Sequence, residues 1–108
     1  MRQDQRSEAL KLSEKLRGRL SSILEEEVEV ILFGSQARGE ATEESDIDVV
    51  VTVSKLNKKT LDLILEVAWE VGFEAGKVIS VIPATFEEME RLSASPFFQA
   101  VKKEGIRV

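Results

Sequence analysis

The run of residues 46–53, DIDVVVTV, is the feature that most constrains the fold. Successive side chains of a β-strand point to opposite faces of a sheet. One face of this run is therefore entirely apolar, and we expect it in the core: Ile47, Val49, Val51 and Val53. The opposite face starts with Asp46 and Asp48, although aspartate is a poor strand former. The run predicts a strand that packs one face against a core and carries charge at one end of the other.

Two longer segments have the apolar spacing of amphipathic helices. Residues 4–26 and 55–70 repeat apolar side chains every three to four positions, which aligns them along one face of a helix. Gly72 is expected to end the second of these helices. Shorter helices are expected after two capping patterns: Thr85 with Glu88, and Ser95-Pro96.

The remaining β-branched runs indicate further strands. Residues 28–33 predict a strand covered on both faces, and residues 77–82 predict another that ends at Pro83. Gly105 should stop the last helix before an edge strand at 106–108. This order of helices and strands predicts an α/β or α+β fold with helices packed on a small sheet.

Composition narrows the chemistry that is open to the chain. Its 108 residues fit a single domain, 1–108, and include no histidine or cysteine. Any catalysis must therefore use carboxylates, hydroxyls, Lys, Arg and metal. A net charge of -5 argues against binding along a nucleic-acid backbone, so we expect no direct DNA binding. The N-terminus lacks the apolar core of a signal peptide, and no apolar run reaches the ~18 residues of a spanning helix, so we expect a cytoplasmic protein without membrane contact.

A glycine-serine break follows the first strand. Gly34 removes the side chain where a ligand would approach the backbone, and Ser35 is a preferred N-cap for the turn that follows. Such a turn can bind an anion such as phosphate. Arg38 falls on the same side and could add its guanidinium to that anion, and Gly39 then ends the turn. An ordinary strand-to-helix connection with a capping serine has the same pattern.

The paired aspartates suggest a metal site. Residues two apart on a strand point to one face with backbones ~6.6 Å apart, so Asp46 and Asp48 can converge on one or two ions. Catalytic metal pairs lie ~3.5–4 Å apart, which carboxylates at that spacing can bridge. The alternative is a strand end that frays into solvent with both charges hydrated. Because an anion cradle and a cation site meet at the ends of successive strands, the combination favours a site for a nucleoside triphosphate with magnesium.

The full pattern resembles a known signature. Gly34-Ser35, ten intervening residues and then Asp46-Ile47-Asp48, with Ala37-Arg38-Gly39 in the gap and Ser45 just before the acids, is similar to that of DNA polymerase β-like nucleotidyltransferases. More narrowly, the chain resembles the minimal nucleotidyltransferases. These are small single domains often encoded beside a helical HEPN protein as a toxin-antitoxin pair. The length and the closing SPFFQAVKKEGIRV are also similar to theirs.

The resemblance implies a nucleotidyltransferase fold with a small mixed sheet. It also implies that Asp46 and Asp48 bind two Mg²⁺ ions and carry the catalysis. Four residues would contact ATP or another nucleoside triphosphate: Gly34, Ser35, Arg38 and Ser45. The reaction would be attack of a hydroxyl on the α-phosphorus, with pyrophosphate leaving.

One position departs from the family pattern. Active members usually carry a third carboxylate on a later strand, where it binds metal and helps to deprotonate the attacking hydroxyl. The matching strand here has Ser80 at that place and no acid. Three nearby acids are substitutes in principle: Glu43, Glu44 and Glu74.

Three functions remain open from the sequence. The first is an enzyme that places AMP on a hydroxyl of a partner HEPN toxin and so acts as an antitoxin. The second is a catalytically impaired binding module that neutralises a HEPN ribonuclease by complex formation. The third is an acidic metal-binding domain, which leaves Gly34-Ser35 and Arg38 unexplained. A homodimer or a hetero-oligomer is possible in each case.

Overall fold

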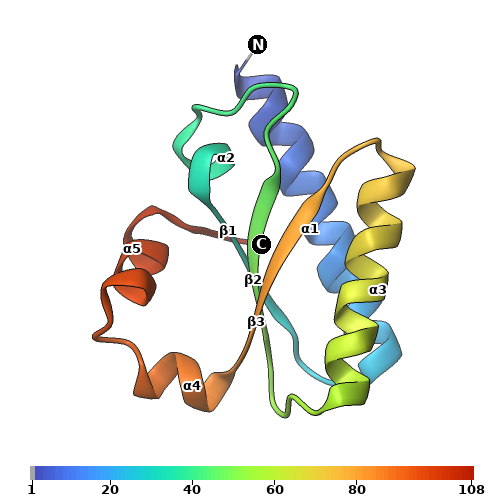
Figure 1. Cartoon of the computed structure of the whole chain (residues 1–108), viewed down its shortest axis with the longest axis vertical. Helices are drawn as coiled ribbons and strands as arrows, with labels where there is room; N and C mark the ends of the chain where they lie inside the picture. Colours follow the sequence, from blue (N-terminus) through green and yellow to red (C-terminus); the bar gives the residue numbers. More distant parts are fainter. Residues whose placement is uncertain (1) are drawn as a thin grey trace.

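The computed structural model describes residues 2–108 of the chain, with side chains from residue 5 onward. Five helices and four strands follow one another along this part of the chain (Figure 1). In order they are α1 (Arg2–Leu24), β1 (Glu29–Phe33), α2 (Gly34–Arg38), β2 (Ile47–Val53), α3 (Lys58–Glu74), β3 (Ile79–Thr85), α4 (Phe86–Arg91), α5 (Pro96–Glu104) and β4 (Ile106–Arg107).

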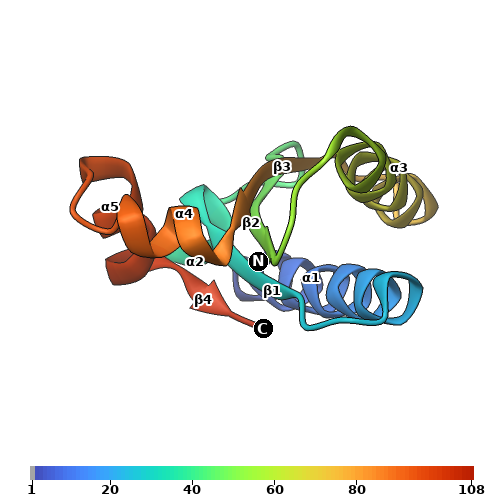
Figure 2. The ribbon, with the colours of Figure 1, turned by 90° about the horizontal axis from the view of Figure 1, so that it is seen from below.

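The strands form one mixed sheet in the order β3-β2-β1-β4. β1 is antiparallel to both β2 and β4, and β2 is parallel to β3. The helices α1 and α3 cover one face of the sheet, and α4 and α5 lie against the other (Figure 2). The predicted α/β arrangement of helices on a small mixed sheet is therefore confirmed. None of the helices in residues 2–108 has the length and apolar character needed to cross a bilayer.

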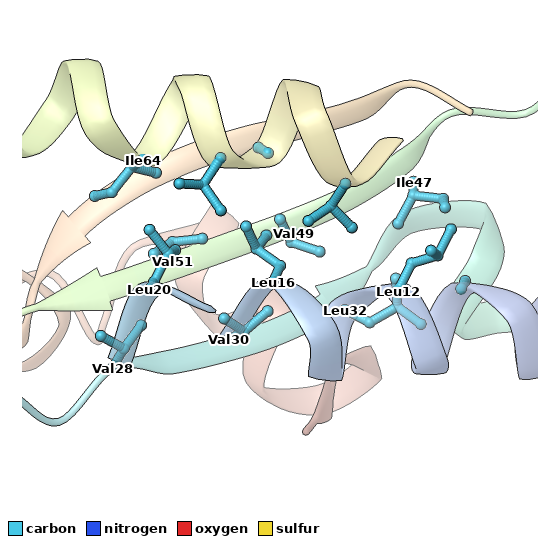
Figure 3. Close-up of a cluster of buried hydrophobic side chains, with 14 of the residues drawn as sticks. Leu12, Leu16, Leu20, Val28, Val30, Leu32, Ile47, Val49, Val51 and Ile64 are labelled. Carbon is cyan, nitrogen blue, oxygen red and sulfur yellow. The ribbon is translucent and has the colours of Figure 1, made fainter. Parts of the chain in front are cut away.

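The main core lies between the sheet and the two long helices (Figure 3). Leu16 and Leu20 of α1 are completely buried there, as is Ile64 of α3. The sheet contributes alternate residues, as the alternation of β2 predicted: Val28, Val30 and Leu32, then Ile47, Val49, Val51 and Val53. A smaller cluster on the opposite face joins Ile31 and Val50 to α5. β1 is thus covered on both faces, as expected.

α3 and β3 begin at Lys58 and Ile79 rather than at 55 and 77. The predicted ends of these two elements were also wrong, and each has a local reason. α3 does not stop at Gly72 but continues to Glu74. A Cβ on Gly72 would lie 2.6 Å from the backbone oxygen of Lys77, so this glycine permits a close approach of helix and strand. Likewise β3 does not end at Pro83 but runs on to Thr85. A proline lacks the backbone N–H, and an edge strand such as β3 tolerates it because one side has no neighbouring strand.

The predicted caps and the terminal edge strand are present. The Thr85 hydroxyl accepts from the backbone N–H of Glu88, and the Glu88 carboxylate accepts from that of Thr85, which completes the capping box of α4. The Ser95 hydroxyl caps α5 in the same way. After Gly105 the chain pairs with β1 as the short strand β4. These caps orient the two helices that flank the outer face of the sheet.

Candidate active site

Asp48 lies between Phe33 and Ser80 on the sheet face that carries α4 and α5. β2 pairs Asp48 directly with Phe33 of antiparallel β1, and with Ser80 of parallel β3. Residues that are directly opposite each other on neighbouring strands point to the same face. One flank of Asp48 is therefore the aromatic ring of Phe33, and the other is the small hydroxyl of Ser80.

The glycine-serine turn meets Asp48 at this point. Gly34 directly follows β1 and has a φ of +72°, in the left-handed region that favours glycine. A Cβ built on Gly34 would lie only 2.6 Å from Oδ2 of Asp48. The carboxylate thus rests against the bare backbone of the turn. The two halves of the sequence pattern occupy one place in the fold.

Ser35 does not cap α2, and that prediction was wrong. The helix begins two residues earlier than expected, so Phe33 takes the N-cap position without a side-chain hydrogen bond. The reason is that the left-handed backbone of Gly34 makes the turn by itself. Gly39, with a φ of 76°, ends the helix as predicted. The half-buried Ser35 side chain is not used as a cap.

Arg38 lies at the exposed end of α2, between two carboxylates. Its Nε donates to Oε1 of Glu40 at 2.6 Å, and its Nη1 lies 3.6 Å from Oε2 of Glu104 on α5. Its positive charge also acts on Asp48, where it lowers the pKa of the carboxyl. Arg38 also lines a hollow of about 180 Å³ together with Gly34, between α2 and α5. A guanidinium is therefore available next to the turn, held by acids that a phosphate would have to displace.

Ser45 holds the loop that leads into the aspartates. Its Oγ accepts from the backbone N–H of Thr42 at 2.9 Å, and its own N–H donates to the Thr42 carbonyl at 3.1 Å. The buried amide of Gln36 reaches its carbonyl oxygen, with Nε2 at 3.5 Å. The contacts of Ser45 in the structure are thus with this loop and with α2.

The surroundings of Asp48 disfavour its negative charge. Burial raises the pKa of the Asp48 carboxyl above its ordinary value, the negative charge of Asp46 raises it further, and Arg38 offsets part of this. Asp46 itself is exposed to solvent. Two neighbouring carboxylates, one of them partly desolvated, form a donor set that suits Mg²⁺, because a bound divalent cation reverses their repulsion. The residues present fit the ion that the resemblance implies.

A third acid is not found at this site. Among the residues that the structure describes, no three carboxylates lie close enough together to hold a metal ion. Glu74 ends α3 and pairs with Arg19 at 2.9 Å and with Lys15 at 3.7 Å, so it faces α1 on the other side of the sheet. The hydrogen bond from Arg19 lowers the pKa of Glu74. Glu43 and Glu44 are exposed in the loop before Asp46. The place beside Asp48 is occupied by Ser80, as the sequence indicated.

Two positioning residues were missed by the sequence analysis. Arg6 of α1 donates to the backbone oxygens of Gln36 and Ala37, with distances of 3.4 and 2.8 Å, and so fixes the end of α2. Lys77 donates from Nζ to the carbonyl of Glu43 at 2.9 Å, which pins the loop before the aspartates. Both act across more than 30 positions of the chain. No local spacing pattern could have indicated them.

Comparison with known proteins defines the class. The family model of the nucleotidyltransferase domain matches residues 13–106. The chain belongs to this nucleotidyltransferase family, and the resemblance stated from Gly34-Ser35 and Asp46-Ile47-Asp48 is confirmed at that level.

Relatives and solved structures agree with this assignment. Two proteins of Methanocaldococcus jannaschii, each named "Putative protein adenylyltransferase", are similar to the chain. One is 33% identical over 94 residues, covering 87% of this chain and 83% of the relative. The other is 30% identical over 103 residues, covering 94% and 99%. A crystal structure from Sulfolobus solfataricus, described as a "putative nucleotidyltransferase", shares the fold with a TM-score of 0.59 at 19% identity, over 98% of this chain and 84% of that one.

Proposed function

We propose that this protein is a Mg²⁺-dependent nucleotidyltransferase of the cytoplasm that transfers AMP from ATP to a hydroxyl of a partner protein. The observation that carries the proposal is the contact between the bare backbone of Gly34 and the carboxylate of Asp48. This contact supports the proposal because it brings the turn proposed to bind phosphate next to one of the two aspartates proposed to bind the metal. The names of the two Methanocaldococcus jannaschii relatives support AMP as the group and protein as the acceptor.

Each candidate residue has a defined task in this reaction. Gly34 leaves room for the triphosphate beside β2, and the Ser35 hydroxyl is free to donate to a phosphate oxygen. Arg38 would exchange its carboxylate partners for the phosphates. Asp46 and Asp48 would hold Mg²⁺, which stabilises the negative charge that develops on the phosphate oxygens. The loop contacts of Ser45 keep these two aspartates in place.

The transfer itself is a substitution at phosphorus. The acceptor hydroxyl oxygen forms a bond to the α-phosphorus, the bond to the β-phosphate oxygen breaks, and pyrophosphate leaves with that electron pair. Ser80 stands where a carboxylate could take the hydroxyl proton, and serine is a poor base at neutral pH. The proton therefore passes to solvent. We expect slow transfer compared with a site that has an acid at this position.

We further propose that the acceptor is a HEPN-domain toxin and that the modification makes this chain its antitoxin. The support is the resemblance to minimal nucleotidyltransferases that are paired with HEPN proteins. The test is incubation of the chain with labelled ATP, Mg²⁺ and the product of the adjacent gene. Label should appear on a hydroxyl side chain of that product, and Asp46→Asn should lower transfer about 100-fold or more. Transfer that is equally fast with Asp46→Asn would refute the enzymatic claim.

A second candidate function is favoured by Ser80, the serine at the place of the third acid. In this case the chain is an impaired nucleotidyltransferase that neutralises a HEPN ribonuclease by complex formation alone. Growth of cells that express the ribonuclease separates the two functions. If the double variant Asp46→Asn, Asp48→Asn still protects the cells, neutralisation by binding is supported. If the double variant is soluble and folded but no longer protects the cells, modification is supported.

A further inference from the structure

Three large apolar side chains are the most exposed of those in the described residues, and they lie at one edge of the molecule: Trp69, Phe73 and Val78. Trp69 and Phe73 of α3 are 64% and 69% exposed, and their rings stack with centroids 4.9 Å apart at an angle of 13°. Leu65 lies one turn before them, and Val78 lies just before β3. We call this set the α3–β3 surface: Leu65, Trp69, Phe73 and Val78.

This surface is hollowed and has no role in the core. A cavity of about 300 Å³ opens between α3 and the start of β3, with Leu65, Trp69, Phe73 and Val78 among its walls. α3 and β3 lie side by side at the edge of the fold (Figure 1), and the free edge of the sheet continues the surface. Contiguous apolar surface of this kind on a small protein marks an interaction site. A stacked aromatic pair is a typical anchor for a protein partner.

The charges around the surface decide which partner fits. Three carboxylates of α3 stand beside the aromatic pair, and all are exposed: Asp62, Glu66 and Glu70. Among the described side chains none of these forms an ion pair. The nearby Lys77 is already engaged by Glu8, at 3.5 Å, and by the carbonyl of Glu43. At the start of α3, Lys58 and Lys59 share a separate hollow with Asp62 and Glu66. Beside the aromatic pair itself the rim is therefore acidic, and it suits a basic counterpart.

A second copy of the chain is a poor occupant of this surface. A two-fold interface sets a surface against itself, so the carboxylates of α3 nearest the axis would face their own copies. Like charges brought together in this way repel. A partner with apolar side chains and a Lys/Arg rim meets the same surface without this cost.

The α3–β3 surface also borders the candidate active site. Val78 stands two residues before Ser80, the neighbour of Asp48. The carbonyl of Val78 accepts from the N–H of Ile47, between the two aspartates, at 2.9 Å. The other flank of Asp48 is closed by Phe33, whose ring packs edge-on against Phe97 of α5. An incoming acceptor therefore has its open approach over the β3 edge.

We propose that the α3–β3 surface docks a partner protein through an apolar face with a basic rim. That this partner is the acceptor of the nucleotidyl group rests on the proposed function. Docking there would bring the acceptor to the Ser80 flank of Asp48. It would also supply the acceptor binding that the candidate site itself does not provide.

The docking can be tested without the partner, because Trp69 is the single tryptophan of the chain. Two model helical peptides with the same leucine face serve as probes, one with a lysine rim and one with a glutamate rim. The lysine-rimmed peptide should shift Trp69 fluorescence to the blue and bind at least tenfold more tightly than the other. The patch variant Leu65→Ser, Phe73→Ser should weaken it at least tenfold. The control variant Ile23→Ser, Leu92→Ser, at exposed apolar positions elsewhere, should not.

Three outcomes would overturn the proposal. Equal weakening by the patch and control variants would show attraction to the net charge only. Equal binding of both peptides would show that the surface does not select a partner with a basic rim. A blue shift that grows with protein concentration, without peptide, would assign the surface to a second copy.

Catalysis gives an independent readout. When a protein that the wild-type chain modifies is used as the acceptor, the patch variant should have a KM for that acceptor at least tenfold higher. The KM for ATP should be unchanged. An unchanged KM for the acceptor would contradict its docking at this surface. Absence of transfer by the wild-type chain would instead sink the proposed function, and the peptide experiment would still stand.

Discussion

The two faces of the sheet differ in the kind of side chain they carry and in how well those side chains are buried. Toward α1 and α3, the four side chains that β2 presents are all aliphatic and at most 1% exposed. Toward α4 and α5, the first side chain that β2 presents is the carboxylate of Asp48. Beside it on β3, Ser80 is partly exposed and Ile82 is exposed. Packed aliphatic side chains stabilise the fold through burial, whereas a partly desolvated carboxylate next to another acid does the reverse.

This contrast separates stability from chemistry within a single strand. Local rules are followed on the core face and broken at Gly34, Asp46 and Asp48, where the backbone is left-handed and acids open a strand. Departures of this kind are expected at functional sites, which the rest of the fold must support. The outer face should therefore tolerate substitutions that the inner face does not, with Gly34 as an exception.

Removal of a buried aliphatic side chain should give the largest loss of stability. Leu32→Ala on the core face should lower the free energy of unfolding by about 3 kcal/mol, since its side chain is fully buried. Ile82→Ala on the outer face, 37% exposed, should cost about 1 kcal/mol or less. Urea denaturation of both variants measures the difference. Equal losses would show that the two faces contribute alike.

A methyl group at Gly34 should lower stability more than the truncation of Ile82 on the same outer face. Gly34→Ala should cost about 2 kcal/mol, because alanine resists a φ of +72° and its Cβ would collide with Asp48. The matched control is Gly18→Ala in α1, where no atom lies within 4 Å of the new Cβ. This control should stabilise by about 1 kcal/mol. Thermal unfolding of the two variants should shift in opposite directions, and a shared direction would contradict the close packing of Gly34 on Asp48.

A carboxylate introduced at position 80 should raise the rate of the proposed transfer at the outer face. Ser80→Asp places a carboxylate beside Asp48, where it can accept the proton of the attacking hydroxyl. The initial rate of AMP transfer to the partner should rise about tenfold or more. Ser80→Asn is the control for size without charge and should give no gain. A rate unchanged by the aspartate would mean that proton removal does not limit transfer.

The smallest effect concerns pH. Because the pKa of Asp48 is raised in the folded chain, the folded state holds its proton more tightly than the unfolded state does. In EDTA, stability should therefore fall as pH rises above the ordinary aspartate value of about 3.9, through the raised pKa. The loss should stay below about 1 kcal/mol, because Asp48 is partly exposed. Asp48→Asn should remove this dependence and raise the Tm at pH 7 by up to about 4 °C. A wild-type pH profile identical to that of the variant would contradict it.

The sequence predicted those features that depend on local spacing. The alternation of β2 and the capping box at Thr85 follow from residue spacing, whereas the place of Ser80 beside Asp48 was indicated by the family resemblance. The extension of α3 past Gly72 and of β3 past Pro83 depends on which elements become neighbours in the fold.

Other features of the site depend on long-range contacts. Arg6 and Lys77 hold the site across the chain, so no spacing pattern indicates them. The α3–β3 surface escaped prediction for a related reason. Leu65 belongs to the apolar spacing of residues 55–70 that predicts the helix, and only the position of α3 at the edge of the fold leaves it exposed.

The most direct test asks whether the turn and the aspartates form one site for magnesium and nucleotide. Isothermal titration with ATP should detect binding by the wild-type chain only when Mg²⁺ is present. Asp46→Asn and Asp48→Asn should each abolish that binding while the chains remain folded by circular dichroism. ATP binding that is equally tight without Mg²⁺, or unaffected by both substitutions, would contradict a shared site.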